Sequence, residues 1–351
     1  MASGKYVAYV GTYTRHNSIG IHIFDIDSEK WSMTERKVVP INNPSDLIVS
    51  ADGRFLYSIA DEGVQSFKIL PDGDLEPMNS AWIVGMRGCY LDVDDQNRYL
   101  FVGGYHDGRV TMMHLNEDGT VGEIADGIFH EGIGCSNADH NFIPHVTCVK
   151  LTVDQKYLCA VDSGLDHVKV YEVDYENGKL KLFNIIRGHI DSAPRMIRFR
   201  RELYCVYVLC EGDNNIYVYH YKTDKCMAKG MELVQIIGTS DTTENIPYAA
   251  SGIEFSPDGK HLFVTNAGIN TAMIYDVDKE TGLLTKNCEN SLGGDYPKTV
   301  AVMPDNEHFI ALNNGGNEIC IFRMNYDKKY FLMDSKPIKI ERPNAIFIHE
   351  L

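Results

Sequence analysis

Three residues that lie far apart in the sequence carry side chains suited to acid–base chemistry on a small molecule. His145 and Arg195 each follow a proline at the start of a predicted strand, and Glu211 follows the end of another. An imidazole ordinarily titrates close to neutral pH (about 6.5), so it can take or give a proton. A guanidinium can bind a negative charge, and a carboxylate can orient the imidazole or act as the base itself. Whether these groups meet depends on the elements that carry them.

Those elements are copies of one repeated unit, which is clearest in residues 250–278 (ASGIEFSPDGKHLFVTNAGINTAMIYDVD). A short apolar run leads to a turn at Pro257-Asp258-Gly259, where proline and glycine supply the dihedral angles of a tight reversal. Alternating apolar residues follow, then a second turn at 267–270 and a β-branched and aromatic run. Looser copies begin at Pro44, Gly88, Pro144, Pro194 and Pro297. Their spacing of roughly 45 to 55 residues is typical of propeller blades of four strands.

The two ends of the chain complete the count of repeats. Residues 342–348 have the pattern of a first strand, whereas 5–10 and 20–25 have the pattern of later strands that lack a first one. The sequence therefore predicts an all-β, seven-bladed β-propeller of four-stranded blades, with the ring closed by N-terminal strands that pair with the C-terminal strand. A closed ring leaves no long unpaired edge. We expect residues 1–351 to form a single domain.

The antiparallel order of strands within a blade predicts which residues share a face. The start of the first strand and the end of the second lie at the same rim of the channel, which is where a propeller would bind a small ligand. His145, Arg195 and Glu211 all fall at this rim. The same rule predicts further substrate-binding residues: Tyr13, Tyr105, Asp162, Ser251 and Lys298. The irregular segment Asp126–Asn141 is predicted to be a loop that covers the rim.

Composition excludes several classes of partner and location. The formal net charge of -16 argues against nucleic acid, which needs a clustered basic face. No long uncharged apolar run and no signal-peptide core occur, so we expect no membrane partner and a cytoplasmic protein. The nine cysteines show no paired spacing, which fits reduced thiols in a reducing compartment. We expect a monomer or a weak homo-oligomer.

Metal and cofactor motifs are the next candidates. Several metal-binding residue types fall within one segment: His130, Cys135, Asp139, His140 and His145. Their spacing matches no zinc signature such as CxxC or HExxH. The sequence also contains no phosphate-binding GxxxxGK[ST] motif and no GxSxG nucleophile elbow. The sequence thus predicts no metal and no cofactor.

Taken together and in order, a set of short motifs resembles the lactonase family of seven-bladed propellers. The motifs are Val10–Thr14, His130–Gly134, Pro144-His145, Asp162–Asp166, Pro194-Arg195 and Glu211. The family includes propeller-type 6-phosphogluconolactonases and the fungal carboxymuconate lactonising enzyme. The resemblance implies hydrolysis of an anionic or sugar-acid lactone at the channel mouth, without a cofactor. It also implies a catalytic group of His145, Arg195 and Glu211, the same three residues that the strand order brings to the rim.

The sequence departs from the family pattern at several rim positions. Histidine, glutamate and arginine residues that the family usually carries are replaced by Tyr90, Thr147, Met196, Gly252 and Ala267, and a later arginine is Lys298. Lysine lacks the planar fork of arginine, so a phosphorylated substrate is less well supported. Two alternatives therefore stay open: a cycloisomerase that acts on an unsaturated carboxylic acid, as in the muconate-type relatives, and a binding propeller without catalysis. Arg195 and Glu211 could also be a structural ion pair.

Overall fold

The structure is a computed structural model that describes residues 4–14, 18–134, 143–200, 203–221, 231–244 and 246–351. The described residues form β-strands joined by turns and loops, with no α-helix among them. Their contacts divide the chain into two compact units. Unit 1 comprises Met1–Pro44, Asn214–Tyr217 and Gln235–Leu351, and unit 2 comprises Ser45–Asp213 and Val218–Val234. The prediction of a single domain over 1–351 stays a prediction.

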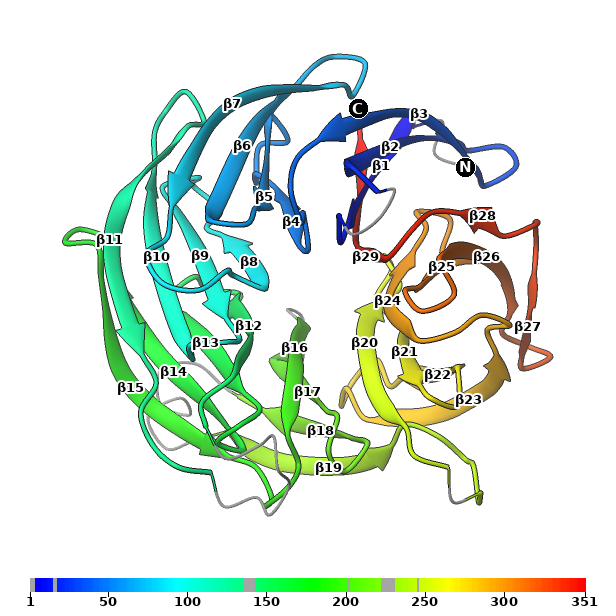
Figure 1. Ribbon diagram of the computed structural model, residues 1–351. Coiled ribbons are helices and arrows are strands. Elements are labelled where there is room, and N and C mark those ends of the chain that lie inside the picture. Colours follow the sequence, from blue (N-terminus) through cyan, green and yellow to red (C-terminus); the bar gives the residue numbers. More distant parts are fainter. Residues whose placement is uncertain (1–3, 15–17, 135–142, 201–202, 222–230, 245) are drawn as a thin grey trace. The chain divides into compact units, whose positions relative to one another are not determined.

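Unit 1 holds three complete sheets, whose strands are labelled in Figure 1. In order of pairing they are β29 (Pro343–Glu350), β1 (Tyr6–Thr12), β2 (Gly20–Asp27) and β3 (Ser32–Pro40); β20 (Ala249–Phe255), β21 (His261–Ala267), β22 (Thr271–Val277) and β23 (Leu284–Ser291); and β24 (Pro297–Val302), β25 (His308–Asn313), β26 (Glu318–Asn325) and β27 (Tyr330–Met333), with β28 (Ile338–Lys339) also paired to β26.

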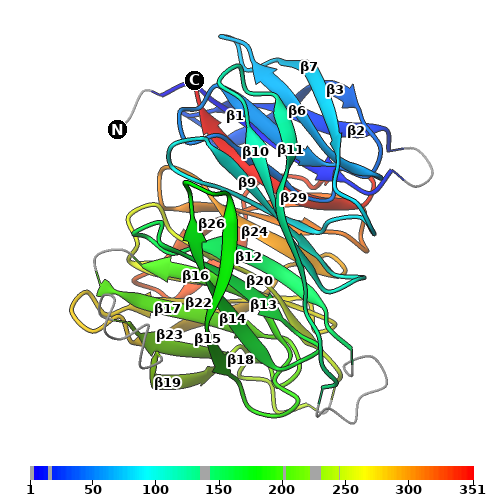
Figure 2. The ribbon, with the colours of Figure 1, turned by 90° about the vertical axis from the view of Figure 1, so that its left-hand side faces the viewer.

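Unit 2 also holds three complete sheets, and Figure 2 shows β9, β10 and β11 side by side. The sheets are β4 (Leu47–Val49), β5 (Phe55–Ile59), β6 (Gly63–Ile69) and β7 (Leu75–Trp82); β8 (Tyr90–Val93), β9 (Tyr99–Gly104), β10 (Arg109–Leu115) and β11 (Val121–Phe129); and β12 (Val146–Leu151), β13 (Tyr157–Asp162), β14 (His167–Asp174) and β15 (Lys179–Arg187). The seventh sheet is β16 (Pro194–Arg200), β17 (Cys205–Cys210), β18 (Asn215–His220) and β19 (Glu232–Gly238).

The pairing of the two chain ends confirms the prediction made for them. β29 runs antiparallel to β1, with Tyr6 opposite Glu350 and Val10 opposite Ile346. The C-terminal strand thereby becomes the first strand of a sheet whose other three strands come from the N-terminus. Seven sheets of the predicted pattern result, and every neighbouring pair of strands described within them is antiparallel.

A recurring tight turn joins the first two strands of a sheet. In residues 256–259 the main-chain N–H of Gly259 donates to the Ser256 carbonyl, and Gly259 has a φ of 68° that favours glycine. Residues 50–53 repeat this turn with Gly53. At the corresponding positions Asn97 and Asn306 adopt positive φ, which asparagine tolerates. The turn that the sequence predicts at Pro257-Asp258-Gly259 is therefore confirmed.

Burial decreases from the second to the fourth strand of a sheet. All six residues of β13 and of β17 are buried, whereas β15 is mostly exposed. Strands covered on both faces are almost continuously apolar, while a strand with one wet face alternates. In unit 2 one core cluster joins Phe101 and Met112 of one sheet to Val149 and Leu158 of the next. The rigid inner strands provide firm attachment points for a site at their ends.

The first strands share an irregularity that the sequence does not reveal. Close to its start the ladder register shifts by one residue in β12, β16, β20 and β24. The residues at the shifts are Thr147, Arg195, Ser251 and Lys298. A bulge of this kind re-aims a side chain relative to the pleat. Three of the predicted site residues therefore owe their direction to a bulge.

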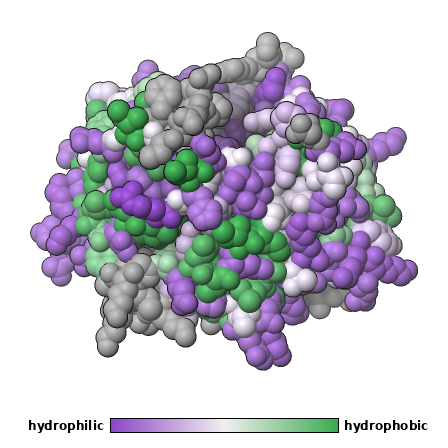
Figure 3. Space-filling view, turned by 90° about the horizontal axis from the view of Figure 1, so that it is seen from below, coloured by the Kyte–Doolittle hydropathy of each residue, from purple (hydrophilic) through white to green (hydrophobic). Residues whose placement is uncertain are grey.

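Surface properties agree with a protein that carries much charge. The face drawn in Figure 3 is mostly hydrophilic, and its hydrophobic residues form separate patches. Within the described part of the chain, no helix is long and apolar enough to cross a membrane.

One detail of the expected loop is wrong: residues 126–129 of the segment Asp126–Asn141 belong to β11, because they continue its ladder with β10. Residues 135–141 of that segment lie outside the described residues.

Candidate functional site

His145 is held by contacts that fix both its ring plane and its tautomer. Its ring lies against the ring of Tyr105, with centroids 4.3 Å apart and planes 11° apart. The ring atom Nδ1 is 2.8 Å from the main-chain oxygen of Tyr105. Because a carbonyl oxygen only accepts hydrogen bonds, Nδ1 must carry the proton and donate. The lone pair of the neutral ring is then on Nε2, which is the arrangement that a general base needs.

Asp162 fixes the main chain around His145. Its Oδ1 accepts hydrogen bonds from the main-chain N–H groups of His145 (2.9 Å), Gly164 (3.1 Å) and Leu165 (3.1 Å). Its Oδ2 lies 2.6 Å from Nδ1 of His130. Burial by itself would raise the pKa of Asp162, but the hydrogen bonds from His130 and from the main chain outweigh burial and lower it. The carboxylate is fully buried. Its described contacts are internal, and its predicted role in substrate binding stays a prediction.

Arg195 and Glu211 form a close ion pair in unit 2. Nη1 of Arg195 lies 2.5 Å from Oε2 of Glu211, and each side chain is about one quarter exposed (23% and 24%). Glu211 is the first residue after β17, and its N–H donates to the carbonyl of Ala193, so the strand ladder positions it opposite the bulge. Arg195 and Glu211 thus lie together and are partly exposed, as the alternative of an ion pair also requires, and their catalytic roles stay a prediction.

His145 immediately precedes β12, Arg195 lies in β16, and these two strands are neighbours. β12 packs against β16 and β8. The hydroxyl of Thr147 lies 3.4 Å from the carbonyl oxygen of Pro194, which joins the starts of the two strands. Thr147 stands where the family pattern has a second histidine, and here its hydroxyl is used between strands. Tyr90, another departure, accepts a hydrogen bond from Nη1 of Arg198 at 2.9 Å. These two replacements therefore have structural partners.

The remaining predicted residues belong to unit 1. Nζ of Lys298 lies 3.3 Å from the hydroxyl of Tyr13 and 4.9 Å from the centroid of its ring. The hydroxyl of Ser251 donates to the carbonyl of Pro297 at 2.6 Å and is buried. Unit 1 therefore brings Lys298 and Tyr13 together, and it uses Ser251 inside the protein. The substrate-binding roles of Tyr13, Ser251 and Lys298 stay predictions.

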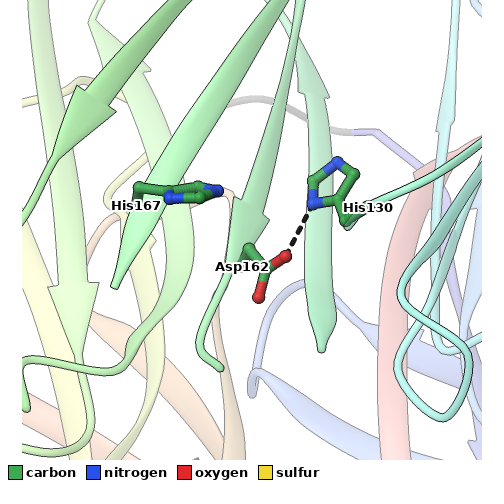
Figure 4. Close-up of side chains that lie close together, drawn as sticks. All are labelled: His130, Asp162 and His167. Carbon is green, nitrogen blue, oxygen red and sulfur yellow. Dashed lines mark hydrogen bonds and ion pairs between the residues drawn. The ribbon is translucent and has the colours of Figure 1, made fainter. Parts of the chain in front are cut away.

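Asp162 belongs to a cluster of three residues, of which the sequence motifs contain His130 and Asp162 but not His167. His130, Asp162 and His167 lie close together, and all three are buried (Figure 4). Burial lowers the pKa of His130 below its usual range, with Asp162 opposing that effect, and burial lowers the pKa of His167 to about 4. Both imidazoles are therefore neutral at pH 7. The signal available in the sequence was that Asp162 and His167 face each other across the turn between β13 and β14.

The comparisons with known proteins agree with this fold. Residues 7–348 match the family described as "Lactonase, 7-bladed beta-propeller". A 6-phosphogluconolactonase from Bacillus subtilis is 27% identical over 99% of both chains. The crystal structure of a protein from Bacteroides fragilis, proposed to be a 6-phosphogluconolactonase, has a TM-score of 0.90 and 26% identity over 99% of both chains. A periplasmic gluconolactonase from Pseudomonas aeruginosa, at 21% identity, shares the fold with a TM-score of 0.91 over 98% of this chain and 99% of that one.

The seven antiparallel sheets are thus the blades of a β-propeller, as predicted from the repeats. The chain belongs to the lactonase family of seven-bladed β-propellers, because the family match extends over nearly its whole length.

Proposed function

We propose that this protein hydrolyses the lactone of a sugar acid and that His145 is the general base. The observation that carries the proposal is the hydrogen bond from Nδ1 of His145 to the carbonyl of Tyr105, which leaves Nε2 as the proton acceptor. Membership of the lactonase family and relatives named 6-phosphogluconolactonase support the same reaction class.

The proposed reaction begins with a water molecule next to His145. Nε2 takes a proton from this water as its oxygen attacks the lactone carbonyl, and the carbonyl becomes a tetrahedral oxyanion. Arg195 stabilises that negative charge through its guanidinium. The intermediate collapses with cleavage of the ring carbon–oxygen bond, and the imidazolium returns its proton to the departing alkoxide. The products are one hydroxyl group and one carboxylic acid, which ionises to a carboxylate and releases one proton, so water is the only other reactant consumed.

Glu211 and Lys298 have supporting parts in this proposal. Glu211 holds the guanidinium of Arg195 in one direction through their ion pair. Lys298 binds an anionic group of the substrate, either a phosphate or a carboxylate. A lysine binds such a group as a point charge rather than through a planar fork. We therefore expect the preference for a phosphorylated over an unphosphorylated lactone to be modest.

The test is hydrolysis of δ-gluconolactone and of 6-phosphogluconolactone, followed by proton release and compared with the spontaneous rate. We expect acceleration by the wild-type protein and a loss of at least about 100-fold in kcat for His145→Ala. His308→Gln is the matched control, since it removes a buried imidazole from β25 in unit 1. Wild-type protein that does not exceed the spontaneous rate would sink the proposal. Thermal stabilisation of the protein by these two lactones without turnover would favour a binding propeller instead.

A further inference from the structure

We propose that His130, Asp162 and His167 form a binding site for one divalent transition-metal ion of the zinc type. The three side chains come from different elements: His130 follows β11, Asp162 ends β13 and His167 begins β14. Each offers one ligand atom, and these atoms lie within 4.8 Å of one another. Two imidazoles and one carboxylate are a usual ligand set for zinc and its neighbours in the first transition row.

The arrangement of the side chains points to an ion between them. Figure 4 shows the ring of His167 directed toward Asp162 and His130. Nε2 of His167 is buried and has no hydrogen-bond partner among the residues that the structure describes, and the whole residue is only 7% exposed. A buried polar atom left without a partner ordinarily costs about 1–3 kcal/mol, so such an atom needs an explanation. A bound cation would supply the missing partner.

The charges of the three groups suit a divalent cation. A neutral imidazole offers one nitrogen lone pair, and the Asp162 side chain, which accepts hydrogen bonds from the His130 ring and from three main-chain N–H groups, offers a carboxylate oxygen. The site thus carries one negative charge before the metal binds. The main-chain N–H groups that hold Oδ1 of Asp162 also orient its carboxylate, as outer-shell partners do in metal sites.

Binding requires a small rearrangement. In a tetrahedral zinc site with bonds of about 2.0–2.1 Å, neighbouring ligand atoms lie about 3.3 Å apart. The ring of His167 would therefore move inward by up to about 1.5 Å. The metal would take the place of the proton now shared by Nδ1 of His130 and Asp162. That proton would move to Nε2 of the same ring, so no proton is lost.

A comparison within the chain shows that the fold does not need these residue types. In unit 1, Asn266 pairs with Thr271 across the turn between β21 and β22, as Asp162 pairs with His167 in unit 2. Thr239 follows β19 and donates its N–H to Asn214, just as His130 follows β11 and donates its N–H to Gly108. Asn266 is also fully buried, and its amide donates to the carbonyl of Thr239 at 2.7 Å. One blade thus uses two threonines and a neutral amide where another has two imidazoles and a carboxylate.

The neighbouring cation Lys169 provides a sign-specific test. Lys169 follows His167 by two residues in β14, so the two side chains lie on the same face of that strand and the ammonium is close to the proposed site. The positive charge of Lys169 repels a metal cation bound at the site. Lys169→Gln should therefore tighten metal binding, an effect that a purely structural role of the cluster would not produce.

The experiment uses the full-length protein after removal of metals with a chelator. Zn²⁺ is titrated in competition with a chromophoric chelator, and Co²⁺ is added separately to record its visible absorption. We expect one ion per chain, an affinity at least tenfold lower in His167→Gln, and an affinity about threefold to tenfold higher in Lys169→Gln. The matched control is His308→Gln, which removes another buried imidazole with a carboxylate partner and should leave the affinity unchanged.

A variant that copies Thr239, Asn266 and Thr271 of unit 1 separates metal binding from folding. The combination His130→Thr, Asp162→Asn and His167→Thr introduces these residue types. It should keep the strand signal in circular dichroism and lose the stoichiometric ion. Absence of binding by the wild type would overturn the proposal. So would equal binding by wild type and His167→Gln, because the ion would then sit on other side chains. The readout is binding alone, so it stands apart from the lactone assay.

Discussion

The two units place different cations at the same point of a blade, and their partners differ. Arg195 in unit 2 and Lys298 in unit 1 each follow the proline that starts a first strand, and each lies at the register shift. Arg195 contacts the carboxylate of Glu211 at 2.5 Å. Lys298 contacts the hydroxyl and the ring of Tyr13. One backbone device therefore supports an ion pair in one unit and a cation–phenol contact in the other.

The difference suggests a division of labour between the two cations. An ion pair that is partly exposed holds a guanidinium in a fixed direction. A phenol exchanges more easily for an incoming anion, because its contact with a cation is worth only about 0.5–1 kcal/mol at exposed sites. If the proposed function is correct, we therefore expect Arg195 to act on the reacting carbonyl and Lys298 to act on an anionic group. Variants at Arg195 and at Lys298 test this assignment.

The largest effect is expected from breaking the ion pair. Arg195→Met should lower kcat by about 100-fold to 1000-fold, as the loss of one oxyanion donor does elsewhere. Stability should fall by no more than about 1 kcal/mol, since both side chains are partly exposed. The double variant Arg195→Met with Glu211→Gln should regain stability without regaining activity. If the double variant is as active as Glu211→Gln alone, Arg195 has only a structural part.

A smaller and different effect is expected at Lys298. Lys298→Met should raise KM about tenfold for a phosphorylated lactone, which corresponds to about 1.4 kcal/mol, with kcat within about twofold. KM for an unphosphorylated lactone should change less. Steady-state kinetics with both substrates measures this split. Lys298→Arg is the control, because it keeps the charge, and its KM should be no higher than that of the wild type. A fall in kcat equal to that of Arg195→Met would remove the distinction between the two cations.

The sequence predicts the blades well because their signals are local. Turn residues such as Gly53 and Gly259 and the β-branched runs between them define the strands, and the leftover patterns at the two ends define the seventh sheet. The strand order also predicts which residues occupy the ends of strands. That order alone places Arg195 and Glu211 at the same rim, where the structure shows them in contact.

The direction of side chains at the rim is harder to predict. The register shift at Arg195 depends on how two strands pair, and no residue type marks it. The contact between His130 and Asp162 joins a connector to the next sheet, so its residues are 32 positions apart. The metal-binding residue types that stand out in the sequence fall within one segment, which leaves out Asp162 and His167. Asp162 was placed correctly at the end of a strand, but its burial depends on neighbours that only the fold brings together.

A prediction on stability, with no expected effect on the reaction, contrasts the pH response of one carboxyl group in each unit. Burial, opposed by the N–H groups of Leu91 and Leu47 and by Arg198 and Lys150, raises the pKa of Asp46 in unit 2 from 3.8 to about 7. The folded protein binds the Asp46 proton more tightly than the unfolded chain does. The protonated carboxyl therefore stabilises the fold below about pH 4, and this stabilisation is lost as the pH rises through 7. Asp46→Asn, which stays neutral, should become more stable than the wild type by about 1–3 kcal/mol between pH 5 and 8.

Asp305 in unit 1 should show the opposite sign. Burial alone would raise its pKa, but hydrogen bonds from His308 outweigh burial and lower it. The ionised form therefore stabilises the native state above the ordinary pKa of 3.8, and that contribution disappears as the pH falls through the lowered value. Asp305→Asn should destabilise the protein at pH 7 and have less effect near pH 3. Urea unfolding of both variants across this range measures the two slopes. Slopes of the same sign would show that the two carboxyl groups do not differ as their surroundings imply.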